Sequence, residues 1–263
     1  MLRKLKEFQL STPEVNQLNI LLHGPIGGGK SSFINSVNTV LQGHNTTGAL
    51  ADSAVGKSFS FTVKFKYHRL KKDVLGSFYP FSFADIMGLE PGTSRGVHTE
   101  DIINILNGHM KSGYTFNPVS PLNEENLNYN SEPSLKDKVH CLVSVLPADN
   151  ISLISEEVNQ KMKYVREKAR KLEIPQAIVM SMVDKACPLV SKDLTKIYTS
   201  KKIKDKMKEC SDKVGVPMNC IFPVMNYHEQ VTNDLYQDVL ILMAMTDIIT
   251  FANDYVVEQV YTE

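Results

Sequence analysis

The sequence has few of the features that mark secreted or strongly charged proteins. It contains no tryptophan and only four cysteines among 263 residues, too few for a disulfide scaffold and spaced unlike any zinc-binding pattern. Free thiols in a reducing cytosol are the simpler interpretation. Lysine plus arginine equals aspartate plus glutamate at 29 each, so the net charge is zero. Nucleic acid is therefore not expected as a partner.

Sequences that direct a chain into a membrane are also absent. The basic N-terminus lacks the continuous apolar core of a signal peptide, and Leu2 stands where myristoylation requires glycine. The longest apolar stretch, Val239–Met245, is too short to cross a bilayer. We therefore expect a cytoplasmic protein without a membrane span.

What the sequence does contain is an alternation of apolar runs and helical periodicity, which is typical of α/β proteins. Strands are expected at Leu18–Leu22, Ser58–His68, Ser82–Met87 (starting near Phe78), Val139–Leu146, Gln176–Val183 and Asn219–Met225. Helices are expected at Lys30–Leu41, Thr99–Met110 with Thr99 as N-cap, Ser155–Leu172, Leu194–Val214 and Thr232–Val256.

This order of elements predicts a Ras-like G domain, a P-loop NTPase three-layer sandwich around a mostly parallel sheet of about six strands. The two strands after the first helix have no helix between them, so one should run antiparallel. Residues 1–17 are expected to form an N-terminal extension, and residues 18–257 a single G domain. An irregular insertion rich in asparagine, proline and serine interrupts it at about 113–137.

A glycine-rich loop between the first strand and the first helix predicts phosphate binding, because Gly-x-x-x-x-Gly-Lys-Ser is the P-loop pattern. Glycines let backbone N–H groups converge on an anion, and the following helix adds the positive end of its dipole. The lysine reaches the β- and γ-phosphates, and the serine hydroxyl binds Mg²⁺. The expected nucleotide contacts are Gly24, Pro25, Ile26, Gly27, Gly28, Gly29, Lys30, Ser31 and Ser32.

An Asp-x-x-Gly motif follows at the end of a neighbouring strand. Asp85 is expected to hold Mg²⁺ through water, and the N–H of Gly88 to sense the γ-phosphate. A threonine from the turn between the first helix and the second strand could complete the metal shell. Thr46 and Thr47 are equally plausible, and an ordinary turn remains an alternative. The expected metal ligands are Ser31, Thr47 and Asp85.

Two residues argue against efficient hydrolysis of GTP. Leu89 follows Gly88, where a GTPase normally has a glutamine that positions water. Ile26 lies in the middle of the loop, where a bulky side chain crowds the entry of a catalytic arginine from a partner. No catalytic residue is assigned; the candidates are Thr47, Glu90 and Arg95, and a solvated loop is the alternative for Arg95.

The base-reading position should follow the fifth strand, where GTPases show Asn/Thr-Lys-x-Asp. Here Asp184 is in place to accept two N–H groups of guanine, but Met182 replaces the lysine. A methionine can cover the base without supplying charge, so selectivity for guanine is weakened but not excluded. Asp184 could instead be a helix N-cap. After the last strand, Asn226 could supply a backbone contact to the base.

Together these motifs resemble the interferon-induced protein 44 and 44-like family. The resemblance rests on GPIGGGKSSFINSV, DIMGLE, FNPVSPL, EPSLKDKVHC and NYHEQ…DVLILMAM, from about Glu14 to about Tyr255. It implies a cytosolic, interferon-inducible protein of innate immunity that binds guanine nucleotide and has an antiviral or antiproliferative role. Longer members carry an N-terminal TLDc-type domain, so a short form is expected.

Three functions are compatible with these motifs. The first is a guanine-nucleotide switch that binds GTP or GDP with Mg²⁺ and hydrolyses GTP slowly or with help from a partner. The second is a nucleotide-binding pseudo-GTPase that acts as a scaffold through protein partners, with self-association possible. The third is a small-molecule kinase, which the absence of an arginine-rich lid in the sequence disfavours.

Overall fold

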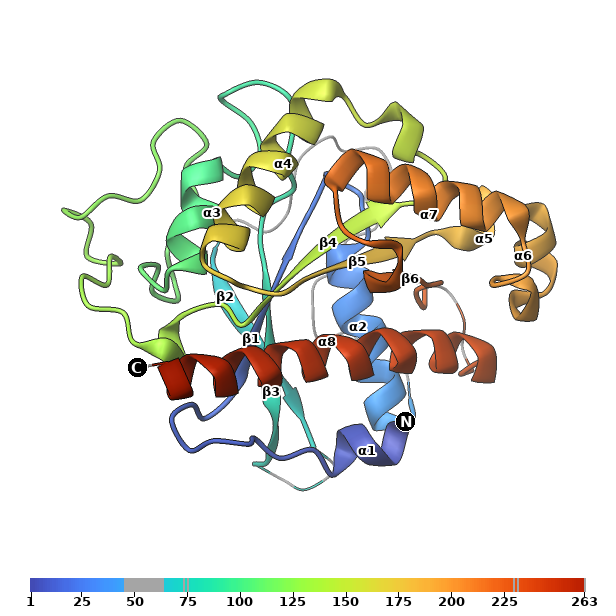
Figure 1. Ribbon diagram of the computed structural model, residues 1–263, viewed down its shortest axis with the longest axis horizontal. Helices are drawn as coiled ribbons and strands as arrows, with labels where there is room; N and C mark the ends of the chain where they lie inside the picture. Colours follow the sequence, from blue (N-terminus) through green and yellow to red (C-terminus); the bar gives the residue numbers. More distant parts are fainter. Residues whose placement is uncertain (45–63, 73, 75, 229, 231, 263) are drawn as a thin grey trace.

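The computed structural model (Figure 1) describes residues 1–44, 64–72, 74, 76–228, 230 and 232–262. Its described strands form one sheet in the order β2-β3-β1-β4-β5-β6, in which β2 runs antiparallel to β3 and the other neighbours are parallel. This is the arrangement of a Ras-like G domain, so the predicted fold class is confirmed. The strands are β1 Leu18–His23, β2 Lys66–Lys71, β3 Phe78–Asp85, β4 Cys141–Pro147, β5 Gln176–Ser181 and β6 Ile221–Pro223.

Helices cover both faces of the sheet and make the other two layers. α2 and α8 pack together on one face, whereas α3, α4 and α7 follow one another across the other face (Figure 1). The helices are α1 Leu2–Lys6, α2 Lys30–Gln42, α3 Thr99–Leu106, α4 Glu156–Lys171, α5 Val183–Ala186, α6 Pro188–Lys192, α7 Lys201–Val214 and α8 Leu235–Thr262.

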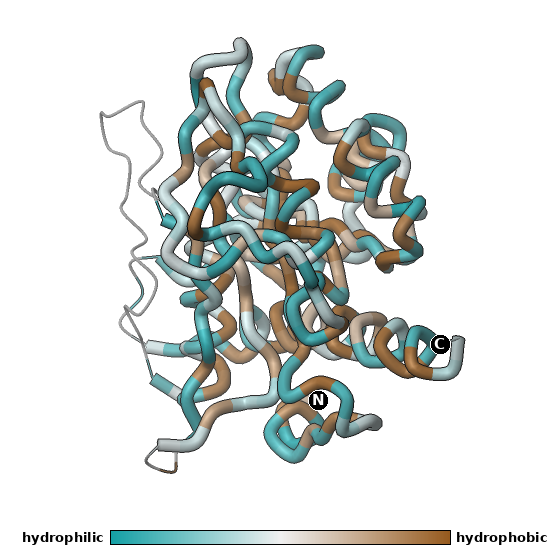
Figure 2. Tube along the Cα trace, turned by 90° about the vertical axis from the view of Figure 1, so that its left-hand side faces the viewer, coloured by the Kyte–Doolittle hydropathy of each residue, from teal (hydrophilic) through white to brown (hydrophobic). Residues whose placement is uncertain are grey.

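The central strands are nearly continuous apolar runs because helices bury them from both sides. All residues of β1 and β4 are buried, whereas the edge strand β2 exposes or half-exposes every residue except Leu70. Figure 2 shows hydrophobic stretches concentrated in the interior of the molecule and hydrophilic ones toward its outside. The chain therefore places its polar loops at the ends of the strands, where a site can form.

Helix α8 is long and apolar enough to cross a membrane by length and composition, with a mean hydropathy of 1.5 in its most apolar window. In that window 56% of the residues are buried against the rest of the molecule. The helix contacts β1, β4, β6 and α2. A core helix of a soluble protein has the same properties, so length and composition do not distinguish the two cases.

Several predicted helix boundaries were wrong. The helix expected over 232–256 runs from Leu235 to Thr262, and three further differences concern α3 and α7. The N-cap of α3 is His98, not Thr99, because the His98 ring accepts a hydrogen bond from the backbone N–H of Glu100 at 3.1 Å. The helix ends at Leu106, just before Gly108, which has a φ of +81°. The helix expected over 194–214 is divided into a 3-10 turn at 194–196 and α7, which Ser200 caps.

The N-terminal segment of the chain packs on the last helix (Figure 1). Buried Leu5 belongs to α1, which packs on α8, and the Asn253 side chain hydrogen-bonds with both the backbone and the side chain of Ser11, at 3.2 and 2.9 Å. The expected N-terminal extension thus contacts the domain through its last helix, while its boundary at residue 17 stays a prediction.

The insertion at about 113–137 contains one 3-10 turn, Leu135–Asp137, and otherwise follows an irregular path. Several side chains of the core bind it, among them Asp101 and Asn19. Asp101 of α3 accepts a hydrogen bond from the Leu122 N–H at 2.7 Å, and the Asn19 amide of β1 donates to the carbonyls of Lys136 and Lys138. The insertion is therefore attached to the core at Leu122, within its length, as well as at Lys136, near its C-terminal end.

Candidate functional site

The glycine-rich loop, residues 24–29, joins β1 to α2 at the carboxyl end of the sheet. It lies directly against β4: a Cβ atom at Gly24 or Gly28 would be 2.4 or 2.8 Å from the Val145 carbonyl oxygen. Gly24 also has a φ of +142°, which disfavours any residue with a side chain. The two glycines are therefore required for the loop to approach β4 so closely.

Side chains from two other strand ends hold the loop in place. The Ser181 hydroxyl, at the end of β5, donates to the Gly28 carbonyl at 2.7 Å. The Asn226 amide, beyond β6, donates to the Gly29 carbonyl at 3.3 Å. Ser181 was not among the predicted site residues. Its signal is its place at the first position of Ser-Met-Val-Asp, where a GTPase has Asn or Thr.

The inner face of the loop presents a group of N–H donors. The N–H groups of Gly27, Gly29, Lys30, Ser31 and Ser32 have no backbone acceptor within the described part of the chain. Because the start of α2 adds the positive end of its dipole, this concave backbone is suited to a multiply charged anion such as a phosphate chain.

Lys30 is positioned to neutralise such an anion. Its ammonium is buried and donates to the Pro25 carbonyl at 3.2 Å and to the Gly24 carbonyl at 3.5 Å. Burial lowers the pKa of Lys30, and the nearby carboxylate of Asp85 opposes that shift. On the loop the Lys30 ammonium has only carbonyl partners, and a bound phosphate would give it an anionic one.

Ser31 and Asp85 form the oxygen cluster expected of a magnesium site. The Ser31 hydroxyl donates to Asp85 Oδ2 at 2.5 Å. Asp85 is 2% exposed, and its Oδ1 is buried with no hydrogen-bond partner among the described residues. An unpaired buried carboxylate oxygen is costly unless a cation or an ordered water meets it. Mg²⁺, which prefers oxygen ligands, fits these two side chains.

His23 lies beneath the loop as an uncharged buried side chain. Its Nε2 is 2.8 Å from the Ser144 hydroxyl, and its Nδ1 is buried without a partner in the described part of the structure. Burial, followed by the proximity of Lys30, lowers the pKa of His23 to about 3. The imidazole is therefore neutral at physiological pH and adds no positive charge beside Lys30.

The Asp-x-x-Gly segment is paired with the phosphate loop. Leu89 N–H donates to the Gly24 carbonyl at 2.9 Å, and Ile26 N–H donates to the Leu89 carbonyl at 3.3 Å, as in a parallel β-bridge. A Cβ atom at Gly88 would be 2.5 Å from the Ile26 Cα. Leu89 is 1% exposed. The residue at the usual glutamine position is thus part of the core and cannot orient a water.

Of the catalytic candidates, Glu90 and Arg95 belong to the described residues. Thr46 and Thr47 lie outside the described residues. Glu90 is half-buried, and its carbonyl accepts a hydrogen bond from Lys161 at 2.8 Å. Arg95 is exposed on the loop before α3.

The residues predicted to read the base lie at the same end of the sheet, Met182 and Asp184 after β5 and Asn226 after β6. Met182 has a left-handed backbone (φ +56°) and is the N-cap of α5, while Asp184 is in the first turn of that helix. The alternative interpretation of Asp184 as an N-cap was therefore wrong. Asn226 contacts the loop through its side chain, and its carbonyl accepts from Gln237 at 3.3 Å. Their roles toward a base stay predictions.

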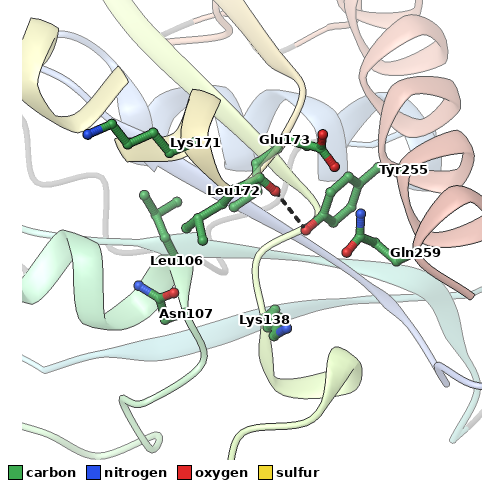
Figure 3. A pocket seen from close by; sticks show the side chains of 9 residues that line it. Leu106, Asn107, Lys138, Lys171, Leu172, Glu173, Tyr255 and Gln259 are labelled. Carbon is green, nitrogen blue, oxygen red and sulfur yellow. Dashed lines mark hydrogen bonds between the residues drawn. The ribbon is translucent and has the colours of Figure 1, made fainter. Parts of the chain in front are cut away.

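A separate cavity of about 220 Å³ lies at the opposite end of the sheet, near the starts of β4 and β5 (Figure 3). The Tyr255 hydroxyl in its wall donates to the Leu172 carbonyl at 3.3 Å. None of the sequence-predicted site residues lines it. The lining residues are Leu106, Asn107, Lys138, Lys171, Leu172, Glu173, Ile174, Tyr255 and Gln259.

The chain matches no family model. Two solved structures are similar to this chain with TM-scores of 0.47 and 12% identity. The probable GTP-binding protein engB covers 90% of this chain and 98% of its own, and Toc33 from Arabidopsis thaliana, in complex with GDP and Mg²⁺, covers 93% and 86%. Similarity at this level carries no functional information, and the fold is established by the strand order.

Sequence relatives are much closer. Interferon-induced protein 44 from Homo sapiens is 32% identical over 255 residues, and that from Mus musculus is 32% identical over 259. The human 44-like protein is 29% identical over 255 residues. Each match covers 97% of this chain but only 56% to 59% of the relative, so the chain spans little more than half of their length. Over nearly its whole length, this chain is similar in sequence to the interferon-induced protein 44 and 44-like family, as its motifs predicted.

Proposed function

We propose that this chain is a guanine-nucleotide-binding protein that holds GDP or GTP together with Mg²⁺ at the phosphate loop. The observation that carries the proposal is the open oxygen of Asp85 beside Ser31, next to a loop of unpaired N–H groups and a buried Lys30. A phosphate chain and a divalent cation together would satisfy all of these groups. Asp184 is the residue proposed to select guanine.

Hydrolysis in this proposal is slow or depends on a partner. Leu89, at the usual glutamine position, is buried and paired with the loop, so this position supplies no group that could orient a water. The same observation favours the second candidate, a pseudo-GTPase that binds nucleotide without turnover and acts through protein partners. The interferon-induced, antiviral and cytoplasmic setting is proposed from the similarity to the interferon-induced proteins, and all four cysteines are free, as expected of a reducing compartment.

Titration calorimetry with GDP, GTP and ATP in the presence of Mg²⁺ tests the binding. Lys30→Ala should weaken GDP binding by about tenfold to a hundredfold, because it removes charge-assisted hydrogen bonds to the phosphates. Lys163→Ala, an exposed lysine on α4, is the matched control and should bind normally. Asp184→Ala should reduce the preference for guanine over adenine. Absence of binding by the unmodified protein would refute the proposal.

Measurement of phosphate release separates the two candidates. If the unmodified protein turns GTP over no faster than Lys30→Ala, the scaffold is the candidate that remains. A higher rate that Lys30→Ala abolishes would support a slow GTPase.

A further inference from the structure

Residues 88–97, which we name the latch segment, run from the end of the Asp-x-x-Gly motif to the start of α3. The first part of the segment is attached to the phosphate loop through both backbone groups of Leu89, at 2.9 Å to Gly24 and 3.3 Å from Ile26. Gly88 packs so closely on Ile26 that a Cβ atom there would be within 3 Å of three Ile26 atoms. Gly88 and Leu89 are therefore packed closely against the phosphate loop.

The latch segment is also closed on itself. Leu89 forms an antiparallel bridge with Gly96, and Val97 N–H donates to the Gly88 carbonyl at 3.2 Å. The buried Leu89 and Val97 anchor the two ends of this small loop in the core. Movement of Gly88 away from the phosphate loop therefore requires these contacts to rearrange as well.

Helix α4 holds the outer side of the latch segment. Lys161 Nζ donates to the carbonyls of Glu90 and Gly92 at 2.8 and 2.5 Å, and Glu157 accepts from the Gly92 N–H at 2.5 Å. Lys161 and Glu157 are themselves 3.9 Å apart. The two side chains come from adjacent turns of one helix, so they lie side by side and both bind the latch segment.

This arrangement bears on the number of phosphates that the site can accept. The donors at Gly27 and at residues 29–31, with Lys30, suffice for two phosphates. In a GTPase a third phosphate extends toward the Asp-x-x-Gly glycine, whose N–H meets it. Here the Ile26 N–H is already bonded to Leu89 and Gly88 lies on Ile26. A third phosphate has to separate the latch segment from the phosphate loop, whereas a diphosphate does not.

We propose that the latch segment makes this site select a nucleoside diphosphate over the triphosphate, with α4 setting the strength of that selection through Lys161. The inference rests on the proposed function of the loop. By linkage, a triphosphate that does bind must loosen the segment from α4, so the nucleotide state would be reported at the surface of that helix.

The test compares Mg²⁺ complexes of GDP and of a non-hydrolysable GTP analogue by calorimetry. The unmodified protein should bind GDP at least about tenfold more tightly, since opening the latch breaks two backbone hydrogen bonds. Lys161→Met should leave GDP affinity unchanged and strengthen binding of the analogue several-fold. Lys163→Met removes a charge from the same helix without touching the segment and should change neither.

The outcomes separate this inference from the proposed function. Equal affinity for the two ligands would overturn the inference and leave nucleotide binding intact, whereas no binding of either would overturn both. Should Lys161→Met fold poorly, hydrogen exchange on the unmodified protein decides the matter. The amides of Ile26 and Leu89 should be protected with GDP and exchange faster with the analogue; equal protection in both complexes would refute the latch.

Discussion

At the scale of single residues, the candidate site is a phosphate loop held by polar side chains from distant strands. Ser31 and Asp85 meet at 2.5 Å although 54 positions separate them in the chain, and Ser181 reaches the loop from 153 positions away. Each of these contacts satisfies a buried polar atom and so stabilises the conformation of a loop rich in glycine.

Ser181→Ala tests this support directly. Loss of the hydroxyl leaves the Gly28 carbonyl without its donor, so we expect a destabilisation of about 1 kcal/mol and a several-fold weaker affinity for GDP. Chemical denaturation and calorimetry measure the two effects. Ser211→Ala is the matched control, because Ser211 donates a similar bond to the Val216 carbonyl far from the loop. It should cost similar stability and leave affinity unchanged; a loss of affinity there would contradict the assignment.

At the scale of elements, the irregular insertion is held on α3 by a buried carboxylate and by the Asn104 amide, which donates to the Leu122 carbonyl at 3.0 Å. Asp101 is buried in α3, and its Oδ1 accepts from Leu122 while its Oδ2 is buried without a partner among the described residues. Burial raises the pKa of Asp101 to about 6, the Leu122 hydrogen bond opposes this shift, and Glu100 adds to it. At neutral pH the Asp101 carboxylate is therefore ionised in a buried position that disfavours its charge.

This disfavoured charge predicts a pH dependence with a definite sign. The folded state holds the Asp101 proton more tightly than the unfolded state, so this group's contribution becomes more favourable as the pH falls through about 6. Asp101→Asn keeps the acceptor for Leu122 and removes the charge. We expect it to raise the midpoint of urea unfolding at pH 7.5, with the gain shrinking by pH 5. A gain that is equal at both pH values would contradict the ionised state of Asp101.

At the scale of the whole molecule, the site joins the carboxyl ends of β1, β3, β4 and β5 to the segment beyond β6. A ligand bound there contacts elements from both halves of the sheet, so its binding energy should stabilise the global fold rather than one loop. The cavity near Tyr255 lies at the other end of the same sheet.

Thermal unfolding measures that coupling. Mg²⁺ with GDP at a hundred times its Kd should add about 2.7 kcal/mol and raise the Tm by roughly 5 °C or more for a chain of this size. Lys30→Ala, which lowers the affinity, should show little shift at the same concentration. A shift of equal size in that variant would place the bound nucleotide somewhere other than the phosphate loop.

The sequence by itself determined the phosphate loop, the Asp-x-x-Gly segment, most strands and the fold class, because these depend on local spacing and on apolar periodicity. The sequence did not predict some helix boundaries, such as the cap of α3 and the division of the helix expected over 194–214. A single hydrogen bond or φ angle decides such boundaries.

Only the tertiary structure decided what surrounds the loop. Leu89 stands at the glutamine position in the sequence, but its burial and its pairing with Gly24 and Ile26 come from contacts more than 60 residues apart. The hydrogen bond from the Lys161 ammonium to the Glu90 carbonyl joins residues that are 71 positions apart. Such pairings follow from the packing of whole elements, which local patterns do not encode, and they determine whether a loop that can bind a nucleotide can also act on it.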